Sequence, residues 1–209
     1  MLNTHQLLSI NWEKVNGLMP CIIQHFISGE VLMHGYMNDK ALDDTQRHKI
    51  VTFYSRTREK LWIKGGKSGH FLHVLKMNID CDCDVLLILA NSINLTCHIQ
   101  KSSCFFGEKT HFTYLFYLDK IIKNKKYLKY NSSYTTSLHQ QGINRISQKV
   151  GEEVVEVVIS VLNKNKIDFI NESSDLIYHL LVLLHNQNLD FNDLINNLRN
   201  RRIHKNINK

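Results

Sequence analysis

The sequence changes its hydrophobic pattern just past its midpoint, and this change limits the folds open to the chain. In the first half, short apolar runs such as 21–26, 51–54 and 85–89 alternate with turn residues, which is typical of strands. In the second half, apolar residues recur every three or four positions, which is typical of helices. We therefore predict an N-terminal α+β domain, mostly β, over residues 1–117 and a C-terminal all-α helical bundle over residues 118–209.

Local signals refine this prediction. Asn38 can cap a helix over residues 38–47, because its side chain can accept from a free N–H of the first turn. The pair Gly65-Gly66 predicts a loop between two paired strands. The β-branched run 154–159 could form a strand, but its repeat of three to four residues favours a buried helix. The two domains are expected to join near residues 118–130.

Apolar content and charge argue against several classes of protein. No apolar run approaches the roughly 20 residues that a membrane-spanning helix needs. The N-terminus shows no basic segment followed by an apolar one, so we expect a cytoplasmic protein. The net charge is +7, but the excess lies mainly in the lysines of residues 118–130 and in the C-terminal tail. Such stretches are more often solvated than nucleic-acid-binding, so we expect neither a nucleic acid nor a membrane as partner.

The segment Asp80-Cys81-Asp82-Cys83-Asp84 carries the most specific chemistry. Its three carboxylates repel one another unless a cation lies between them. If the segment is extended, the aspartates point to one side and the cysteines to the other. Oxygen ligands suit Mg²⁺ and thiolates suit Zn²⁺. The alternative is a solvated turn without a metal.

Further cysteines, Cys97 and Cys104, follow this segment, and His98 stands beside the first of them. The odd total of five cysteines argues against a disulfide framework. Three cysteine ligands with an open fourth position describe a catalytic zinc, because a water bound there is deprotonated near neutral pH. Taken singly, each cysteine is better explained as a small core residue. Taken together, they favour a metal site.

Several motifs occur in order along the first half: residues 29–38, 55–65 and 68–70, the D-C-D-x-D motif at 80–84, and the C-H-x₅-C motif at 97–104. On these motifs the sequence resembles the bifunctional histidine-biosynthesis enzymes that join phosphoribosyl-AMP cyclohydrolase to phosphoribosyl-ATP pyrophosphatase. The resemblance implies that water opens the adenine ring of phosphoribosyl-AMP to give the formimino product (ProFAR). It also implies a homodimer whose zinc ligands come from both subunits.

The resemblance further implies roles for individual residues. The expected Mg²⁺ ligands are Asp80, Asp82 and Asp84, and the expected Zn²⁺ ligands are Cys81, Cys97 and Cys104. The candidates for substrate contact are Arg56, Trp62, Lys64, Ser68 and His70, where Trp62 could equally be a core residue. His98 is the candidate for general base or proton shuttle, with an ordinary surface histidine as the alternative. Gly65-Gly66-Lys67-Ser68-Gly69 departs from the family's usual Gly-Glu-Thr-Ser-Gly, which affects substrate contacts rather than metal chemistry.

Acidic residues interrupt two apolar segments of the second half. The first group is Glu152, Glu153 and Glu156, and the second is Glu172 and Asp175. Because residues three or four positions apart share a helix face, the acids of each group can lie on one face. Two such faces opposed across a bundle suit Mg²⁺ and pyrophosphate chemistry, whereas solvated faces are the alternative.

Residues 133–135, 148–153 and 174–181 resemble the pyrophosphatase half of the same enzymes, a relative of the all-α nucleotide pyrophosphohydrolases. The resemblance implies that water attacks the α–β phosphate linkage of phosphoribosyl-ATP and releases pyrophosphate. It assigns Mg²⁺ to all of these acids, with Glu172 the weaker candidate, and phosphate contacts to Arg145 and Lys149.

The sequence therefore predicts a two-step hydrolase. One alternative is a zinc-stabilised basic module that binds RNA or another acidic partner, which would need clustered basic and aromatic residues. Another is a chain in which one active site has decayed, and the altered Gly66-Lys67 loop is the feature that suggests it.

Overall fold

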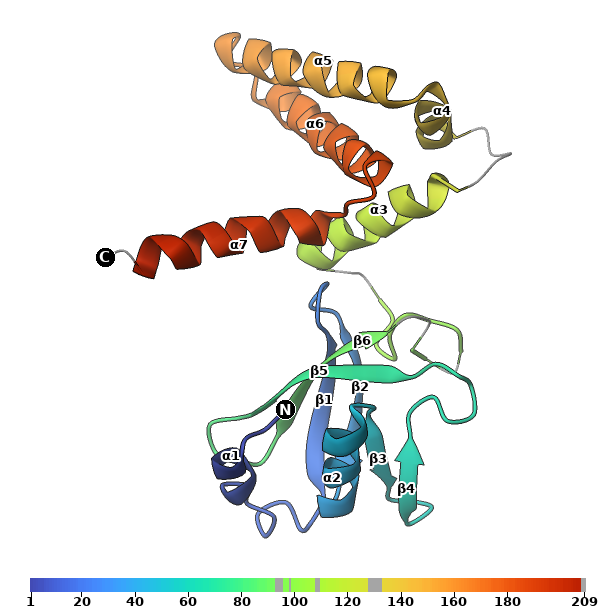
Figure 1. Ribbon diagram of the computed structural model, residues 1–209, viewed down its shortest axis with the longest axis vertical. Helices are drawn as coiled ribbons and strands as arrows, with labels where there is room; N and C mark the ends of the chain where they lie inside the picture. The colour runs from blue at the N-terminus through green and yellow to red at the C-terminus, as the bar shows by residue number, and fades with distance from the viewer. Residues whose placement is uncertain (93–95, 98, 108–109, 128–132, 208–209) are drawn as a thin grey trace. The chain divides into compact units, whose positions relative to one another are not determined.

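The computed structural model describes residues 1–92, 96–97, 99–107, 110–127 and 133–207 of the chain. It divides into two compact units, Met1–Thr113 and Tyr114–Lys209. The first unit is built mostly from strands and the second from helices (Figure 1), so the predicted fold class is confirmed.

The first unit contains a main sheet, a small sheet and two helices. The main sheet has strand order β2-β1-β6-β5, in which β1 and β6 run parallel and the other neighbours antiparallel. The elements in chain order are α1 (Thr4–Leu8), β1 (Met19–His25), β2 (Val31–Met37), α2 (Asp39–His48), β3 (Thr52–Ser55), β4 (Lys60–Ile63), β5 (Leu72–Ile79) and β6 (Leu86–Ser92). Alternate residues of β1 face the core, where Met19, Cys21 and Ile23 are fully buried.

Two local contacts explain where α2 begins and how closely the small sheet approaches the main sheet. Asn38 caps α2 as expected, because its Oδ1 accepts from the Ala41 N–H at 2.9 Å. Gly35 of β2 lies against the ring of Phe53, which belongs to β3 of the small sheet. A Cβ at position 35 would lie 2.4 Å from that ring, so only glycine allows this approach.

One local prediction in this unit is wrong, and of the two conformations left open for residues 80–84 the structure has the turn. Gly65-Gly66 does not connect paired strands, because β4 pairs with β3 through the short turn 56–59, while β5 pairs with β6. Residues 80–84 are not extended but form the turn between β5 and β6. Asp80 Oδ1 accepts from the N–H groups of Asp84 and Val85, at 2.9 and 3.0 Å, and this closes the turn.

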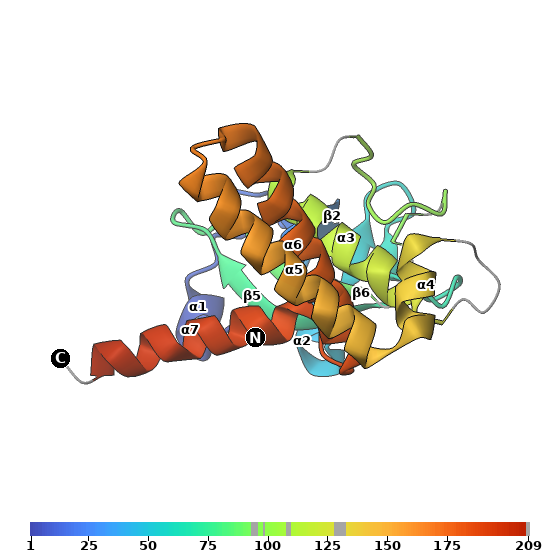
Figure 2. The ribbon, with the colours of Figure 1, turned by 90° about the horizontal axis from the view of Figure 1, so that it is seen from above.

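The second unit is a set of helices around a small apolar core. The helices are α3 (His111–Lys125, which begins before the division between the units), α4 (Tyr134–Gln141), α5 (Ile143–Leu162), α6 (Lys166–Asn186) and α7 (Phe191–Ile207). Helices α5 and α6 follow one another through a short connection and lie side by side (Figure 2). The core residues are Ile122, Leu138, Ile146, Leu181 and Val182.

The expected join near residues 118–130 is helical over its first part, because α3 extends to Lys125. Leu115, Leu118 and Ile122 recur at helical spacing and pack in the core, which explains why a lysine-rich stretch forms a helix. The run 154–159 is helical as predicted, but it is not buried within one chain. Val154 and Val161 are 45% and 54% exposed, because α6 covers the opposite side of α5, where Glu153 and Ser160 are buried.

None of the helices in the described part of the chain combines the length and the apolar character that crossing a membrane requires.

Candidate functional sites

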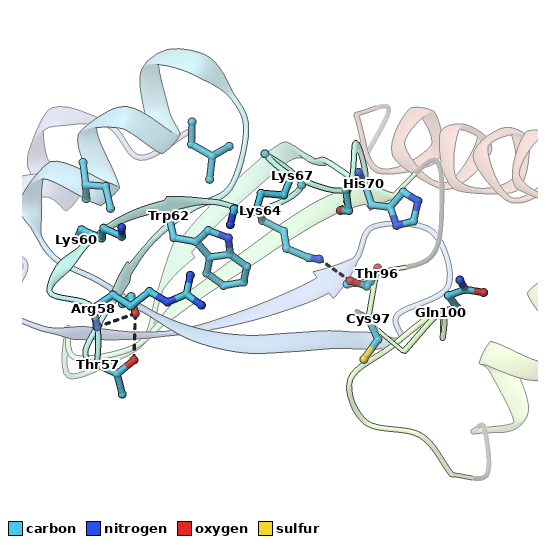
Figure 3. A pocket seen from close by; sticks show the side chains of 16 residues that line it. Thr57, Arg58, Lys60, Trp62, Lys64, Lys67, His70, Thr96, Cys97 and Gln100 are labelled. Carbon is cyan, nitrogen blue, oxygen red and sulfur yellow. Dashed lines mark hydrogen bonds between the residues drawn. The ribbon is translucent and has the colours of Figure 1, made fainter.

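A cavity of about 920 Å³ opens between β4, the loop that follows it, and the residues Thr96, Cys97 and Gln100 (Figure 3). This volume lies in the range of pockets that hold small metabolites. Four of the five predicted substrate contacts line the cavity, namely Trp62, Lys64, Ser68 and His70, together with the predicted zinc ligand Cys97. The fold thus brings residues of the segments 55–65 and 68–70 to one place with Cys97.

Trp62 forms a wall of this cavity. Its ring stacks on Phe53, with centroids 5.6 Å apart and an interplanar angle of 29°, and the residue is 44% exposed. It is therefore not a core tryptophan, which leaves it available to pack against a planar ligand.

Lys64 has a structural contact that the sequence did not indicate. The residue is buried, and its Nζ donates to the Thr96 carbonyl at 2.5 Å (Figure 3). This bond ties the loop after β4 to the residue beside Cys97.

Arg56 does not line the cavity. Its guanidinium lies over the ring of Tyr36, 4.0 Å from the centroid. Besides the predicted Lys64, three basic residues that sequence reasoning missed line the cavity, namely Arg58, Lys60 and Lys67. Arg58 belongs to the same turn as Arg56, and the sequence alone could not tell which of the two lines the cavity. These cations would favour a phosphate-bearing ligand.

Two of the predicted zinc ligands lie together. The Cys104 thiol hydrogen-bonds the Cys97 side chain, and its pKa is raised by partial burial and by that neighbour, while Lys64 opposes the rise. The third, Cys81, is exposed and precedes β6, whereas Cys97 follows that strand. A strand of this length spans on the order of 20 Å, and among the described residues of one chain these three thiols do not form a group within 4.8 Å. His98, the candidate base, lies outside the described residues.

The predicted magnesium ligands of the first unit do converge, although through a turn rather than through strand alternation. Asp80, Asp82 and Asp84 each offer a carboxylate oxygen within 4.8 Å of the others. Such a set of hard oxygens fits Mg²⁺. The ammonium of Lys14, a residue that the sequence analysis did not single out, lies 2.5 Å from Asp82 Oδ2 and 2.6 Å from Asp84 Oδ2. Its hydrogen bond holds the pKa of Asp82 below the usual range.

A second carboxylate cluster lies on the facing sides of α5 and α6. Glu153, Glu156 and Glu172 offer oxygens within 4.8 Å of one another, which also fits Mg²⁺. The pKa of Glu172 is raised by burial, by its hydrogen bond to Glu156 and by like charges nearby, a repulsion that a cation would relieve. Glu172, the weaker candidate from sequence, is thus one of three carboxylates at the centre.

The remaining predicted residues of this half lie at the edge of the cluster. Glu152 pairs with Lys149 at 2.9 Å and with Arg145 at 3.4 Å, and it is not one of the three clustered carboxylates. Asp175 is also outside the three, although its charge contributes to the raised pKa of Glu172.

A buried histidine supports the cluster and was missed from sequence. His179 Nε2 lies 3.6 Å from Glu153 Oε1 and 3.4 Å from the Tyr134 hydroxyl. Burial lowers its pKa, with Glu153 opposing, so the imidazole is neutral near pH 7. Its position in the segment 174–181, at helical spacing from Asp175, was the available signal.

Comparison with known proteins gives the same division of the chain. The phosphoribosyl-AMP cyclohydrolase family matches residues 33–106, and the phosphoribosyl-ATP pyrophosphohydrolase family matches residues 116–202. The chain is 52% identical over 208 residues to the histidine biosynthesis bifunctional protein HisIE of Buchnera aphidicola from Acyrthosiphon pisum, which covers 100% of this chain and 96% of that protein. It is 49% identical over 202 residues to the protein of the same name from Escherichia coli K12. That match covers 96% of this chain and 99% of the E. coli protein.

Proposed function

The chain belongs to the bifunctional histidine-biosynthesis enzymes with a phosphoribosyl-AMP cyclohydrolase and a phosphoribosyl-ATP pyrophosphohydrolase domain, and from this premise we propose how its residues divide the chemistry. Both domains are hydrolases. The helical unit acts first, cleaving phosphoribosyl-ATP to phosphoribosyl-AMP and pyrophosphate. The first unit then opens the adenine ring to give the formimino product. One observation carries the proposal: each unit gathers three carboxylates within 4.8 Å, and the first unit places its cavity beside a pair of thiols.

In the helical unit, Glu153, Glu156 and Glu172 would hold Mg²⁺. When bound, this ion offsets the charge of the phosphate oxygens and orients the attacked phosphorus. Lys149 donates to Glu153 Oε1 at 2.8 Å and Arg145 lies at the edge of the cluster, so both cations can meet phosphates that extend beyond it. His179 and Lys149 fix the orientation of Glu153.

In the first unit, Cys81, Cys97 and Cys104 would hold Zn²⁺, and Asp80, Asp82 and Asp84 would hold Mg²⁺. When bound, zinc supplies a water of lowered pKa for attack at C6 of the purine. Trp62 offers a flat face for the base, and Arg58, Lys60 and Lys67 offer positive charge for the two phosphates of phosphoribosyl-AMP. His98, next to Cys97 in the chain, is proposed to move the proton.

The separation of the thiols within one chain supports a homodimer with a shared zinc site. Because Cys81 and Cys97 lie at opposite ends of β6, a complete zinc site needs Cys81 from one subunit and the other two cysteines from its partner. The exposed valines of α5 support association of the helical units as well, since Val154, Val155 and Val158 are each about half exposed in one chain. We propose that the dimer works in the cytoplasm.

The direct test is a product assay with the purified full chain, phosphoribosyl-ATP, Mg²⁺ and trace Zn²⁺, followed by chromatography and absorbance. Appearance of pyrophosphate and of the ring-opened product supports both activities. Accumulation of phosphoribosyl-AMP would mean that the first unit is impaired and would favour a decayed site at Gly66-Lys67. Salt-sensitive RNA binding without turnover would support the binding-module alternative instead.

A further inference from the structure

Lys14 lies at the position between carboxylates that a divalent cation would need. Its Nζ contacts Asp82 Oδ2 at 2.5 Å and Asp84 Oδ2 at 2.6 Å, so one ammonium bridges two of the three clustered carboxylates. The ion pairs raise the pKa of the lysine, which therefore stays charged at neutral pH. The third carboxylate, Asp80, instead uses Oδ1 to accept the two backbone N–H groups that close the turn.

The fold itself delivers Lys14 to this place. The segment after α1 contacts the turn between β5 and β6, where the Asn11 N–H donates to the Cys83 carbonyl at 3.1 Å. Asn11 Oδ1 in turn accepts from the Lys14 N–H at 3.0 Å. Trp12 and Val15, on either side, pack against the core of the unit. These contacts hold the backbone of Lys14 beside the acidic turn, although Lys14 and Asp82 are 68 positions apart in the sequence.

The side chain of Lys14 is nevertheless free to leave. It is 42% exposed, whereas its backbone is held. Mg²⁺ binds carboxylate oxygens at roughly 2.0–2.1 Å and demands near-octahedral geometry. An ammonium that touches the same two oxygens would lie too close to that ion, because both would compete for the same lone pairs and the two charges repel.

We propose that Lys14 is a competing counter-cation: it occupies the site between Asp82 and Asp84 in the metal-free enzyme, and a divalent cation displaces it. The inference rests on the proposed magnesium site of the first unit. The lysine offsets the charges of Asp82 and Asp84 before metal arrives, while Asp80 closes the turn, so the turn is preformed. In return it weakens metal binding, and only a cation that binds the aspartates more strongly than an ammonium does can enter.

The test is isothermal titration calorimetry of the zinc-loaded full chain with MgCl₂. The variants are Lys14→Met, which keeps most of the aliphatic stem but removes the charge, and Asp82→Asn, which identifies the binding event that belongs to this turn. Lys40→Met, at an exposed position of α2, controls for the loss of one positive charge. The binding event of interest is the one that Asp82→Asn weakens. Lys14→Met is expected to raise the Mg²⁺ affinity of this event by about three- to tenfold, the scale of two exposed ion pairs. Lys40→Met should leave it unchanged.

The outcomes separate this inference from the proposed function. If Asp82→Asn leaves every Mg²⁺ binding event unchanged, the turn is not a magnesium site and the proposed function of these aspartates fails. If Asp82→Asn removes an event but Lys14→Met leaves its affinity unchanged or weakens it, the site stands and the competition is wrong. Thermal unfolding gives a second readout, since saturating Mg²⁺ should raise the midpoint of Lys14→Met more than that of the parent chain. Lys14→Gln serves in both measurements if the methionine variant does not fold.

Discussion

Lys149 Nζ lies 2.8 Å from Glu153 Oε1, so the buried carboxylate of the helical unit is held by a cation four residues earlier on its own helix. The same ammonium lies 2.9 Å from Glu152, which is three residues away. Helical geometry alone produces this arrangement, because residues three and four apart share a face. Lys149 contacts Oε1 of Glu153, and we expect the other oxygen to bind the proposed metal ion, so that Glu153 and Glu152 would have different roles.

Glu153→Gln should therefore lower the rate of pyrophosphate release by roughly a hundredfold or more, because it removes a charged carboxylate from the centre of the proposed metal site. The cyclohydrolase activity, assayed with phosphoribosyl-AMP, should be unchanged. Glu152→Gln is the matched comparison one residue away, and it should cost clearly less because Glu152 points to Lys149 and Arg145. Equal losses in the two variants would mean that the metal site extends along the whole acidic face.

The sequence predicted those parts of the sites that depend on local geometry. The acids of α5 and α6 were found because helical spacing places them on one face, and the cap at Asn38 because one side chain decides it. The sequence did not predict Lys14 at the aspartate turn, since that contact joins residues 68 positions apart. Nor did it separate Arg56 from Arg58, because the two share a turn, and the contact of Arg56 with Tyr36 joins residues that are distant in sequence.

Burial was the least predictable property. The apolar repeat of α5 indicated a helix correctly, but a pattern of valines does not tell which neighbour covers them. In one chain α6 covers the side that carries Glu153, and Val154 and Val161 remain exposed. The pairing of the strands that flank Gly65-Gly66 was predicted wrongly for a similar reason: the glycines mark a loop, but strand pairing depends on partners distant in sequence.

Gly65→Ala should impair the cyclohydrolase through the loop that carries Lys64, Ser68 and His70. Gly65 has φ +94°, and a Cβ there would lie 2.5 Å from the backbone of His70, so the loop must shift. We expect a loss of at least about tenfold in cyclohydrolase activity and a fall in the unfolding free energy of about 1–3 kcal/mol. Pyrophosphate release should not change.

Gly69→Ala is the control for this glycine, because Gly69 also has positive φ, +73°, but an added Cβ would meet nothing within 4 Å. It should cost only the backbone strain, about 1 kcal/mol. The difference between the two variants in urea unfolding, followed by the fluorescence of Trp12 and Trp62, isolates the steric contact. Equal stability and equal activity of the two variants would contradict the close approach at Gly65.

His139→Leu should stabilise the helical unit, and more so in mild acid. Both ring nitrogens of His139 are buried without a hydrogen-bond partner, and burial, with Lys126 and His185 nearby, lowers its pKa below 6.5. As pH falls below about 6.5, the unfolded chain binds a proton that the folded chain refuses, so stability is lost. The leucine variant does not lose stability in this way. It also removes the two unsatisfied nitrogens, which should raise the free energy of unfolding by about 1 kcal/mol or more.

The measurement is urea unfolding by circular dichroism at about pH 7.5 and about pH 5.5, the range in which an ordinary histidine titrates. Circular dichroism reports mainly on the helices, whereas both tryptophans lie in the first unit and report on it separately. Part of the pH dependence should remain in the variant, because His179 also has a lowered pKa. If the free energy of unfolding differs between the two pH values by the same amount in the variant and in the parent chain, His139 does not titrate in this range.

Mixing two inactive variants tests the shared zinc site. Cys81→Ser and Cys97→Ser should each abolish the cyclohydrolase and lower the zinc content, because each removes a ligand from both sites of the dimer. If Cys81 of one subunit meets Cys97 and Cys104 of its partner, a hybrid dimer has one site lacking two ligands and one intact site. Denaturing and refolding an equal mixture should then restore about a quarter of the parent activity, since half of the dimers are hybrids with one working site.

Cys83→Ser is the control for this experiment, because Cys83 occupies the variable position of the motif and should keep both zinc and activity. Zinc content measured by atomic absorption follows the same arithmetic as the activity and does not depend on turnover. An equal mixture that stays as inactive and as poor in zinc as its components would mean that each subunit binds zinc alone. In that case Cys81 would have to be excluded from the site, because β6 separates it from the other two thiols.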